Sequence, residues 1–255
     1  MQLNKPLVTI IMTVYKRSDW FLTQLEGLKQ QTIPHEIWVD YTIPEGGQQY
    51  DLQQVAPDCK FNTHPNQNLK YHGRFYYGLN AQTPYVFIID DDILPGRDYL
   101  KNCISIIKEK GECLLTPYGV KINPKSQSYE NVTRCGWHDI VHNRPYDYCK
   151  EVDMAGHSWF IKRETLKYVA YEQPYTYQTG EDLHFSYCVH KYGNIPIYAT
   201  PHPSHKPEIW GCDPEYGMKI GNDNNASYKQ NNFIKLRNDI VKHQIKNGWK
   251  LVRNK

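Results

Sequence analysis

Apolar runs alternate with helix-like segments through the N-terminal half of the chain. The runs at residues 7–14, 36–39 and 85–89 are almost continuously apolar, as is typical of strands that are buried on both faces of a sheet. Between the first two runs, Phe21 and Leu25 follow helical spacing. Such repeated βα units predict an α/β fold whose central sheet is mostly parallel and flanked by helices.

The remaining predicted elements are shorter. A strand near residues 59–63 and a helix over 71–81 are expected before the third apolar run. Further along, a strand over 158–161 leads to a helix near 163–169, and another helix can begin at Gly180. The length of 255 residues suits one large domain or two small ones, and we see no internal repeat or clear linker.

The last thirty residues differ in charge from the rest. Residues 226–255 hold eight Lys or Arg and a single acid, Asp239, with an apolar stripe that includes Phe233 and Ile240. We expect a single domain over residues 1–225 and a basic C-terminal helical extension after it. The helix either packs on the domain with a solvated basic face or is attracted to an anionic membrane, a lipid diphosphate or a polyanion.

Composition limits the class of protein. The chain has no apolar run of the roughly 20 residues needed to cross a bilayer, and no signal peptide is recognised at its start. Its seven cysteines are odd in number and include no C-x-x-C pair, which argues against a zinc ribbon or a disulfide framework. We expect a soluble protein of a reducing compartment, the cytoplasm, with peripheral membrane contact through the basic helix as an open possibility.

Three adjacent acids, Asp90, Asp91 and Asp92, directly follow the apolar run at 85–89. In open α/β sheets, ligands bind at the carboxyl ends of the strands. Crowded carboxylates repel one another unless a proton or a cation neutralises them, and carboxylate oxygens suit Mg²⁺ or Mn²⁺. Because side chains alternate along an extended chain, we expect Asp90 and Asp92 to face one ligand while Asp91 points away. The alternative is a solvated acidic turn that caps the next helix.

Several other acid-rich or glycine-rich motifs are excluded. An EF-hand loop begun at Asp90 would place Leu94, Pro95 and Lys101 where an oxygen ligand, Gly and Glu are required. The chain has no P-loop, no G-x-G-x-x-G and no H-E-x-x-H, and residues 156–158 lack the second Gly of a nucleophile elbow. These absences remove the sequence support for P-loop, dinucleotide-binding, zincin and α/β-hydrolase chemistry.

Four segments, taken in order, resemble a GT-A-fold glycosyltransferase, most closely the family 2-like group. They are residues 8–17, the strand that ends at Asp40, residues 68–80 with Arg74, and residues 86–92. The resemblance implies a GT-A, Rossmann-like fold that holds a nucleotide diphosphate sugar, UDP- or GDP-linked, over the edge of the sheet. It also implies Mn²⁺ or Mg²⁺ as the cofactor that bridges the diphosphate to the protein.

The resemblance divides the domain into a nucleotide-sugar half, about 1–110, and an acceptor half, about 111–225. It implies donor contacts from nine residues. These are Thr13, Tyr15 and Arg17 around the nucleotide, Asp40 at the base or ribose, Asn68 in the donor-binding segment, Arg74 near the diphosphate, and Asp90, Asp91 and Asp92 in the D-x-D motif, with Asp92 as the expected direct metal ligand and Asp90 beside it. Alternatively, Arg74 is a solvated helix residue.

The resemblance extends more loosely to residues 180–183, where Glu181 and Asp182 match an acidic motif beside the acceptor. We expect Asp182, with Glu181, to act as the base of an inverting transfer; the alternative is a pair that only caps a helix. His202 or His205 is a candidate additional metal ligand, against the alternative of a surface loop without a ligand.

Rival functions remain open. The segment at residues 73–78 departs from the usual family 2 pattern and, with the triple Asp, is similar to retaining exostosin-like transferases. A sugar nucleotidyltransferase would carry a Gly-rich loop after the first strand, which residues 13–17 lack. A non-catalytic carbohydrate- or nucleotide-binding module is the third class. The expected acceptor is a glycan, a lipid-linked molecule or a protein, and no nucleic acid partner is expected.

Overall fold

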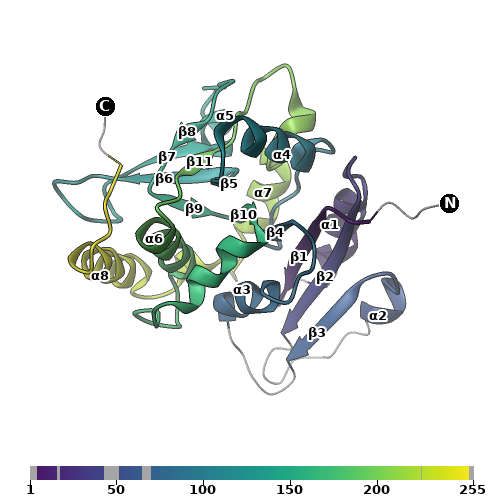
Figure 1. Ribbon diagram of the computed structural model, residues 1–255, viewed down its shortest axis with the longest axis horizontal. Helices are drawn as coiled ribbons and strands as arrows, with labels where there is room; N and C mark the ends of the chain where they lie inside the picture. The colour runs from purple at the N-terminus through teal and green to yellow at the C-terminus, as the bar shows by residue number, and fades with distance from the viewer. Residues whose placement is uncertain (1–4, 16–17, 43–51, 65–69, 225, 253–255) are drawn as a thin grey trace.

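Eight strands form one mixed sheet in the order β3-β2-β1-β4-β10-β5-β11-β8, and helices flank it (Figure 1). The computed structural model describes residues 5–15, 18–42, 52–64, 70–224 and 226–252. The predicted α/β class, with a mostly parallel sheet, is confirmed for this part of the chain.

The parallel half of the sheet is the part that the apolar runs predict. Strand β1 (Val8–Val14) pairs in parallel with β2 (His35–Thr42) on one side and with β4 (Tyr85–Ile89) on the other. Strand β3 (Lys60–His64) extends the sheet beyond β2, also in parallel. The prediction that the second strand ends at Asp40 is wrong, because β2 continues through Thr42.

The other half of the sheet contains antiparallel pairs. Strand β10 (Ser158–Lys162) runs antiparallel between β4 and β5 (Leu114–Thr116). Beyond β5 lie β11 (Ile197–Ala199), which is parallel to it, and β8 (Lys150–Glu151), which is antiparallel to β11. The reversal at β10 places the start of that strand beside the end of β4.

A second, three-stranded antiparallel sheet has the order β7-β6-β9. Its strands are β6 (Tyr118–Ile122), β7 (Val132–Gly136) and β9 (Met154–Gly156). A single residue, His157, separates β9 from β10 and has a positive φ of 66°. The chain therefore passes from the small sheet to the large one at His157.

Helices occupy the connections between strands. The α-helices are α1 (Phe21–Lys29), α2 (Leu52–Val55), α3 (Gly73–Gly78), α4 (Tyr99–Lys110), α5 (Trp137–Val141), α6 (Glu181–Gly193), α7 (Pro214–Gly221) and α8 (Phe233–Lys246). The 3₁₀ helices are η1 (Ser18–Trp20), η2 (Lys70–His72), η3 (Arg163–Ala170), η4 (Pro207–Ile209) and η5 (Ser227–Lys229). The helix expected over 71–81 is divided into η2 and α3 and ends at Gly78, and the helix expected near 163–169 is entirely the 3₁₀ segment η3.

The continuous apolar runs reflect a core on each face of the sheet. Along β1, Ile10 and Met12 enter one buried cluster together with Leu25 of α1. The alternate residue Ile11 enters the opposite cluster together with Phe75 of α3. Because successive strand side chains point to opposite faces, burial of both faces requires an unbroken apolar sequence.

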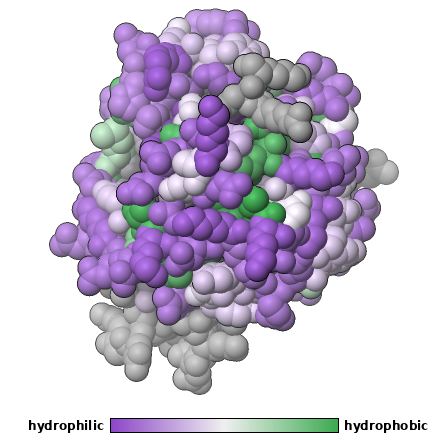
Figure 2. Space-filling view, turned by 90° about the vertical axis from the view of Figure 1, so that its left-hand side faces the viewer, coloured by the Kyte–Doolittle hydropathy of each residue, from purple (hydrophilic) through white to green (hydrophobic). Residues whose placement is uncertain are grey.

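Helix α8 packs on the domain. Its Ile240 and Val241 lie in a third buried cluster with Leu183 and Tyr187 of α6. The face of the molecule on the α8 side is largely hydrophilic, with separate apolar patches between polar side chains (Figure 2). Among the described helices, none combines the length and the apolar character required to traverse a bilayer.

Candidate functional site

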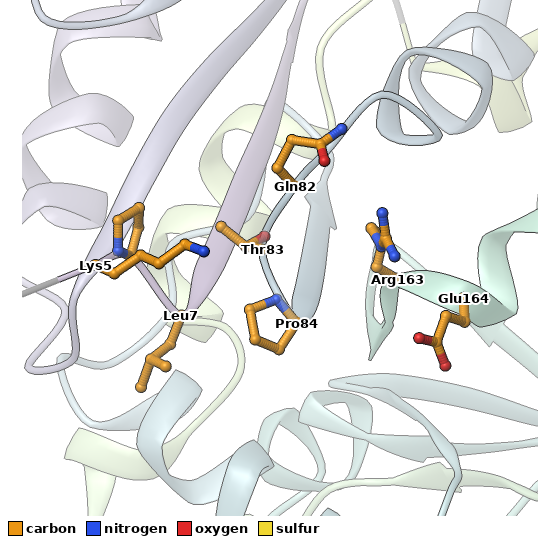
Figure 3. A pocket seen from close by; sticks show the side chains of 8 residues that line it. Lys5, Leu7, Gln82, Thr83, Pro84, Arg163 and Glu164 are labelled. Carbon is orange, nitrogen blue, oxygen red and sulfur yellow. The ribbon is translucent and has the colours of Figure 1, made fainter.

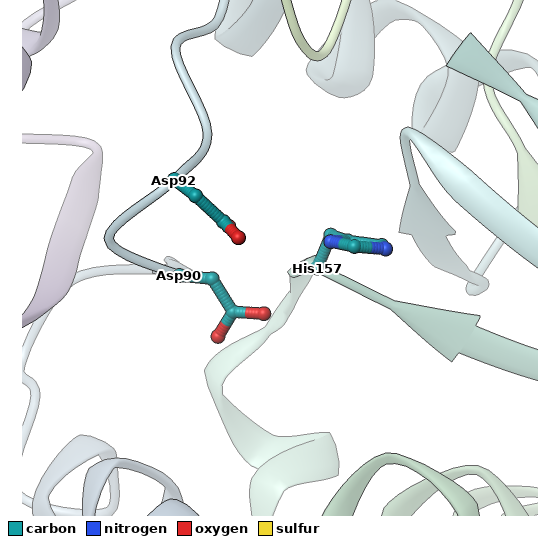
Figure 4. Close-up of side chains that lie close together, drawn as sticks. All are labelled: Asp90, Asp92 and His157. Carbon is teal, nitrogen blue, oxygen red and sulfur yellow. The ribbon is translucent and has the colours of Figure 1, made fainter. Parts of the chain in front are cut away.

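Asp90, Asp92 and His157 converge at the carboxyl end of β4. One potential ligand atom from each lies within 4.8 Å of those of the other two (Figure 4). The chain turns at Asp91 and Asp92 instead of remaining extended, so it is a turn, and not strand alternation, that sets the directions of these side chains. Asp91 does not belong to the group.

Helix α1 holds this turn in place. The buried side chain of Gln24 donates hydrogen bonds to the carbonyl oxygens of Asp90, at 2.6 Å, and Ile93, at 2.8 Å. Backbone pairing fixes the position of His157, since the amide of Asp90 donates to the carbonyl oxygen of His157 at 2.9 Å. These contacts join α1, the end of β4 and the start of β10, and they hold the three side chains in a defined arrangement.

The donor set of this group fits a divalent cation. Two carboxylates supply hard oxygen ligands, and an imidazole is a borderline nitrogen ligand, a combination that suits Mn²⁺. Burial lowers the pKa of His157, although the charges of Asp90 and Asp182 oppose this. A neutral imidazole keeps the lone pair that coordination needs.

Arg74 of α3 connects this group to the acid pair. It is only 3% exposed, so it is not the solvated helix residue of the alternative interpretation. One guanidinium nitrogen forms an ion pair with Asp90, and the other donates to Oε1 of Glu181 at 3.0 Å. The guanidinium also lies 4.8 Å from the ring of Trp159, which is fully buried. Arg74 thus spans the two acidic sites.

Glu181 and Asp182 occupy the first turn of α6, after Gly180 in a left-handed conformation. Burial and the neighbouring charge of Asp182 raise the pKa of Glu181 to about 7, against the opposing effect of Arg74. Asp182 accepts a hydrogen bond from Arg237 of α8 at 2.7 Å. Each acid therefore has its own buried arginine partner.

The expected nucleotide side lies along one row of the sheet. Thr13 of β1 is paired with Asp40 of β2, which in turn is paired with Asn62 of β3. The side chain of Asn62 donates to Asp40 at 3.2 Å, and Asp40 is buried. The hydroxyl of Thr13 is buried without a hydrogen-bond partner among the described residues. Tyr15 follows on from this strand and is partly exposed.

Two predicted donor residues, Arg17 and Asn68, lie outside the described residues. The two histidines proposed as additional ligands, His202 and His205, do not belong to the group at Asp90. His202 is fully buried, and its Nδ1 donates to the carbonyl oxygen of Thr200 at 2.8 Å. His205 is exposed. In the described structure the imidazole beside the two aspartates belongs to His157.

Aromatic rings border His157 on the side of the small sheet. The rings of Tyr118 and Trp137 meet it edge to face, with centroids 4.5 Å and 5.7 Å away. Sugar rings pack well on such apolar and amphipathic faces. Trp159 is a core residue that supports Arg74.

A separate surface pocket of about 360 Å³ lies at the opposite edge of the sheet (Figure 3). Its lining includes Leu7 and Pro84, which precede β1 and β4, and Arg163, which follows the antiparallel β10. Since all three positions are at the far end of the strands from Asp90, this pocket is not part of the site above.

Three contributors to the site were not predicted as such: His157, Gln24 and Arg237. The sequence contains a cue for His157, because it adjoins the strand over 158–161, but only antiparallel pairing with β4 brings it to Asp90. Gln24 and Arg237 are polar residues on helices whose contacts lie 66 and 55 residues away in the chain. No local pattern identifies contacts of that kind.

Comparison with protein families finds no family model that matches the chain, and comparison with curated proteins finds no significant match. What can be inferred about the function of the molecule therefore depends on its fold, which is α/β with a mixed sheet, and on the geometry of the site.

Proposed function

We propose that this protein is a metal-dependent glycosyltransferase that moves a sugar from a nucleotide diphosphate sugar to an acceptor hydroxyl. The observation that carries the proposal is the convergence of Asp90, Asp92 and His157 at the carboxyl edge of the sheet. This is the edge at which open α/β sheets bind ligands. The resemblance of the surrounding segments to GT-A transferases supports the same assignment.

On the donor side, Thr13 and Asp40 are proposed to bind the nucleoside. Both lie in adjacent strands at the edge where Asp90 stands, and Asp40 offers a buried carboxylate to base or ribose hydroxyls. Mn²⁺ or Mg²⁺ bound by Asp90, Asp92 and His157 would neutralise charge on the leaving diphosphate. Arg74 would add positive charge at the same place, and its pairing with Asp90 keeps it there.

On the acceptor side, the proposed proton acceptor is an acid of the Glu181 and Asp182 pair, with Asp182 first. An inverting transfer needs one carboxylate within hydrogen-bond reach of the acceptor hydroxyl. Arg74 links Glu181 to Asp90, and Asp182 is the next residue along the chain. Retention, as in exostosin-like transferases, is the alternative outcome, and the anomeric configuration of the product distinguishes the two.

The test is thermal-shift screening of UDP- and GDP-sugars with and without Mn²⁺, followed by assay of nucleotide release. Ligand binding raises the melting temperature by mass action. We expect a shift with one donor that depends on Mn²⁺ and is lost in Asp92→Ala, while Asp58→Ala, at an exposed position, behaves as wild type. Sugar binding without turnover would favour a binding module. Release of pyrophosphate from a nucleoside triphosphate would favour a nucleotidyltransferase.

A further inference from the structure

Helix α8 contacts the start of α6 through two residues, Arg237 and Ile240, that are three positions apart on one face. Arg237 donates to Oδ2 of Asp182 at 2.7 Å. Ile240 packs on Gly180, the residue before Glu181, so closely that a methyl group at Gly180 would collide with its Cδ1. The C-terminal helix thus packs against the start of α6, in agreement with the first of the two alternatives given for it by its charge pattern.

Arg237 is fixed in place before any substrate binds. Its side chain is 4% exposed, and the guanidinium lies 4.0 Å from the ring centroid of Tyr129 and 5.1 Å from that of Phe233. The neighbouring Asn238 accepts a hydrogen bond from the amide of Tyr129 at 2.7 Å, which anchors α8 to the loop before β7. A buried guanidinium needs an anionic partner, and Asp182 is the carboxylate that it contacts.

Asp182 is held at both oxygens. Oδ2 accepts from Arg237, and Oδ1 accepts from the amide of Leu183 at 2.7 Å. The adjacent Glu181 is held instead by Arg74 from α3. Like charges at adjacent positions repel. Here two arginines from different helices each neutralise one of the two consecutive acids and hold their side chains in different directions.

We propose that Arg237 is a positioning residue, which orients the Asp182 carboxylate beside Glu181 and makes helix α8 part of the acceptor side of the site. This inference rests on the proposed function. It assigns Arg237 no contact with the donor, so its loss should impair turnover and leave the binding of the nucleotide sugar and Mn²⁺ unchanged.

The first experiment compares Arg237→Met and Arg237→Lys with Lys242→Met, a control at an exposed position of the same helix. The probes are UDP- and GDP-sugars with Mn²⁺, read by thermal shift for binding and by nucleotide release for turnover. We expect Arg237→Met to lose about 10-fold to 100-fold in turnover, as for other orienting partners, with an unchanged donor shift. Arg237→Lys, which keeps the charge, should recover part of the rate.

The second experiment is a double-mutant cycle with Asp182→Asn. If Arg237 acts through Asp182, Arg237→Met should cost little further turnover in the Asp182→Asn background. If Arg237→Met gives no cooperative melting transition, Arg237→Lys takes its place in the cycle. Full turnover in the folded single variant, or losses that multiply in the double variant, would overturn the positioning role. Failure of wild type to release nucleotide in the presence of Mn²⁺ would instead reject the proposed function. The melting temperatures of the same four proteins would still measure the coupling between Arg237 and Asp182.

Discussion

The amide of Asp90 donates to the carbonyl oxygen of His157 at 2.9 Å, which joins the end of β4 to the start of β10. The two residues are 67 positions apart in the chain, and the antiparallel pairing of their strands is what brings their side chains to one point. The positive φ of His157, 66°, then sets the direction of the imidazole. Left-handed backbone at a non-glycine residue is uncommon and often lies at a functional site.

His157→Ala should weaken Mn²⁺ binding. The variant removes one of the three converging side chains that offer a ligand atom. The dissociation constant should therefore rise by about tenfold or more, since the loss of even an outer partner of a metal ligand costs about 10-fold to 100-fold. Titration with Mn²⁺, followed by the electron paramagnetic resonance signal of the free ion, measures this. His205→Ala, at an exposed position, is the control, and equal affinities in the two variants would exclude His157 as a ligand.

Arg74→Met should destabilise the fold. Arg74 is buried against Asp90 and Glu181, and its removal leaves two carboxylates without their cation. Breaking a buried ion pair from one side costs about 3–5 kcal/mol. Urea denaturation in metal-free buffer measures the free energy of unfolding, with Arg97→Met, at an exposed position, for comparison. A loss below about 1 kcal/mol would mean that the Arg74 network contributes little to the fold.

The free energy of unfolding should decrease as the pH is lowered, because of His202. Burial lowers the pKa of His202 to about 4 in the folded chain, from an ordinary value of 6.5. Between these two pH values the unfolded chain binds more protons, so stability is lost as the pH falls from about 6.5 towards 4. By pH 5 this one residue should account for a loss of about 2 kcal/mol relative to pH 7.5.

The check is urea denaturation of wild type and His202→Gln at several pH values. The variant has no imidazole to protonate, so the difference between the two free energies should narrow at low pH. Burial also lowers the pKa of His72 to about 4. His72 is present in both proteins, so its contribution to the pH dependence cancels in the comparison. A difference that stays constant from pH 7.5 to 5 would show that His202 is protonated equally in the folded and unfolded chains.

The parallel half of the sheet and the position of the three acids were predictable, because both depend on local sequence. Strand β4 ends at Ile89, where the apolar run stops and the aspartates begin. What could not be predicted depends on contacts between distant segments. The antiparallel insertion of β10 selects His157, and not His202, as the imidazole near Asp90. The packing of α8 converts Arg237 from one of eight basic residues in the tail to a buried partner of Asp182.

Gly180→Ala should be destabilising and should be rescued in part by Ile240→Val. Gly180 has a φ of +83°, where an L-residue is disfavoured by about 1–2 kcal/mol, and its added methyl would meet Cδ1 of Ile240. Val lacks that atom, so Ile240→Val should remove the steric part of the cost of Gly180→Ala. The double variant should then lose only the backbone cost of Gly180→Ala together with the about 0.5–1.5 kcal/mol that Ile240→Val costs alone. Thermal and urea denaturation of the four proteins measure the coupling. Strictly additive losses would show that α8 yields without resistance, and the close packing of Ile240 on Gly180 would then not be what fixes the helix beside the acid pair.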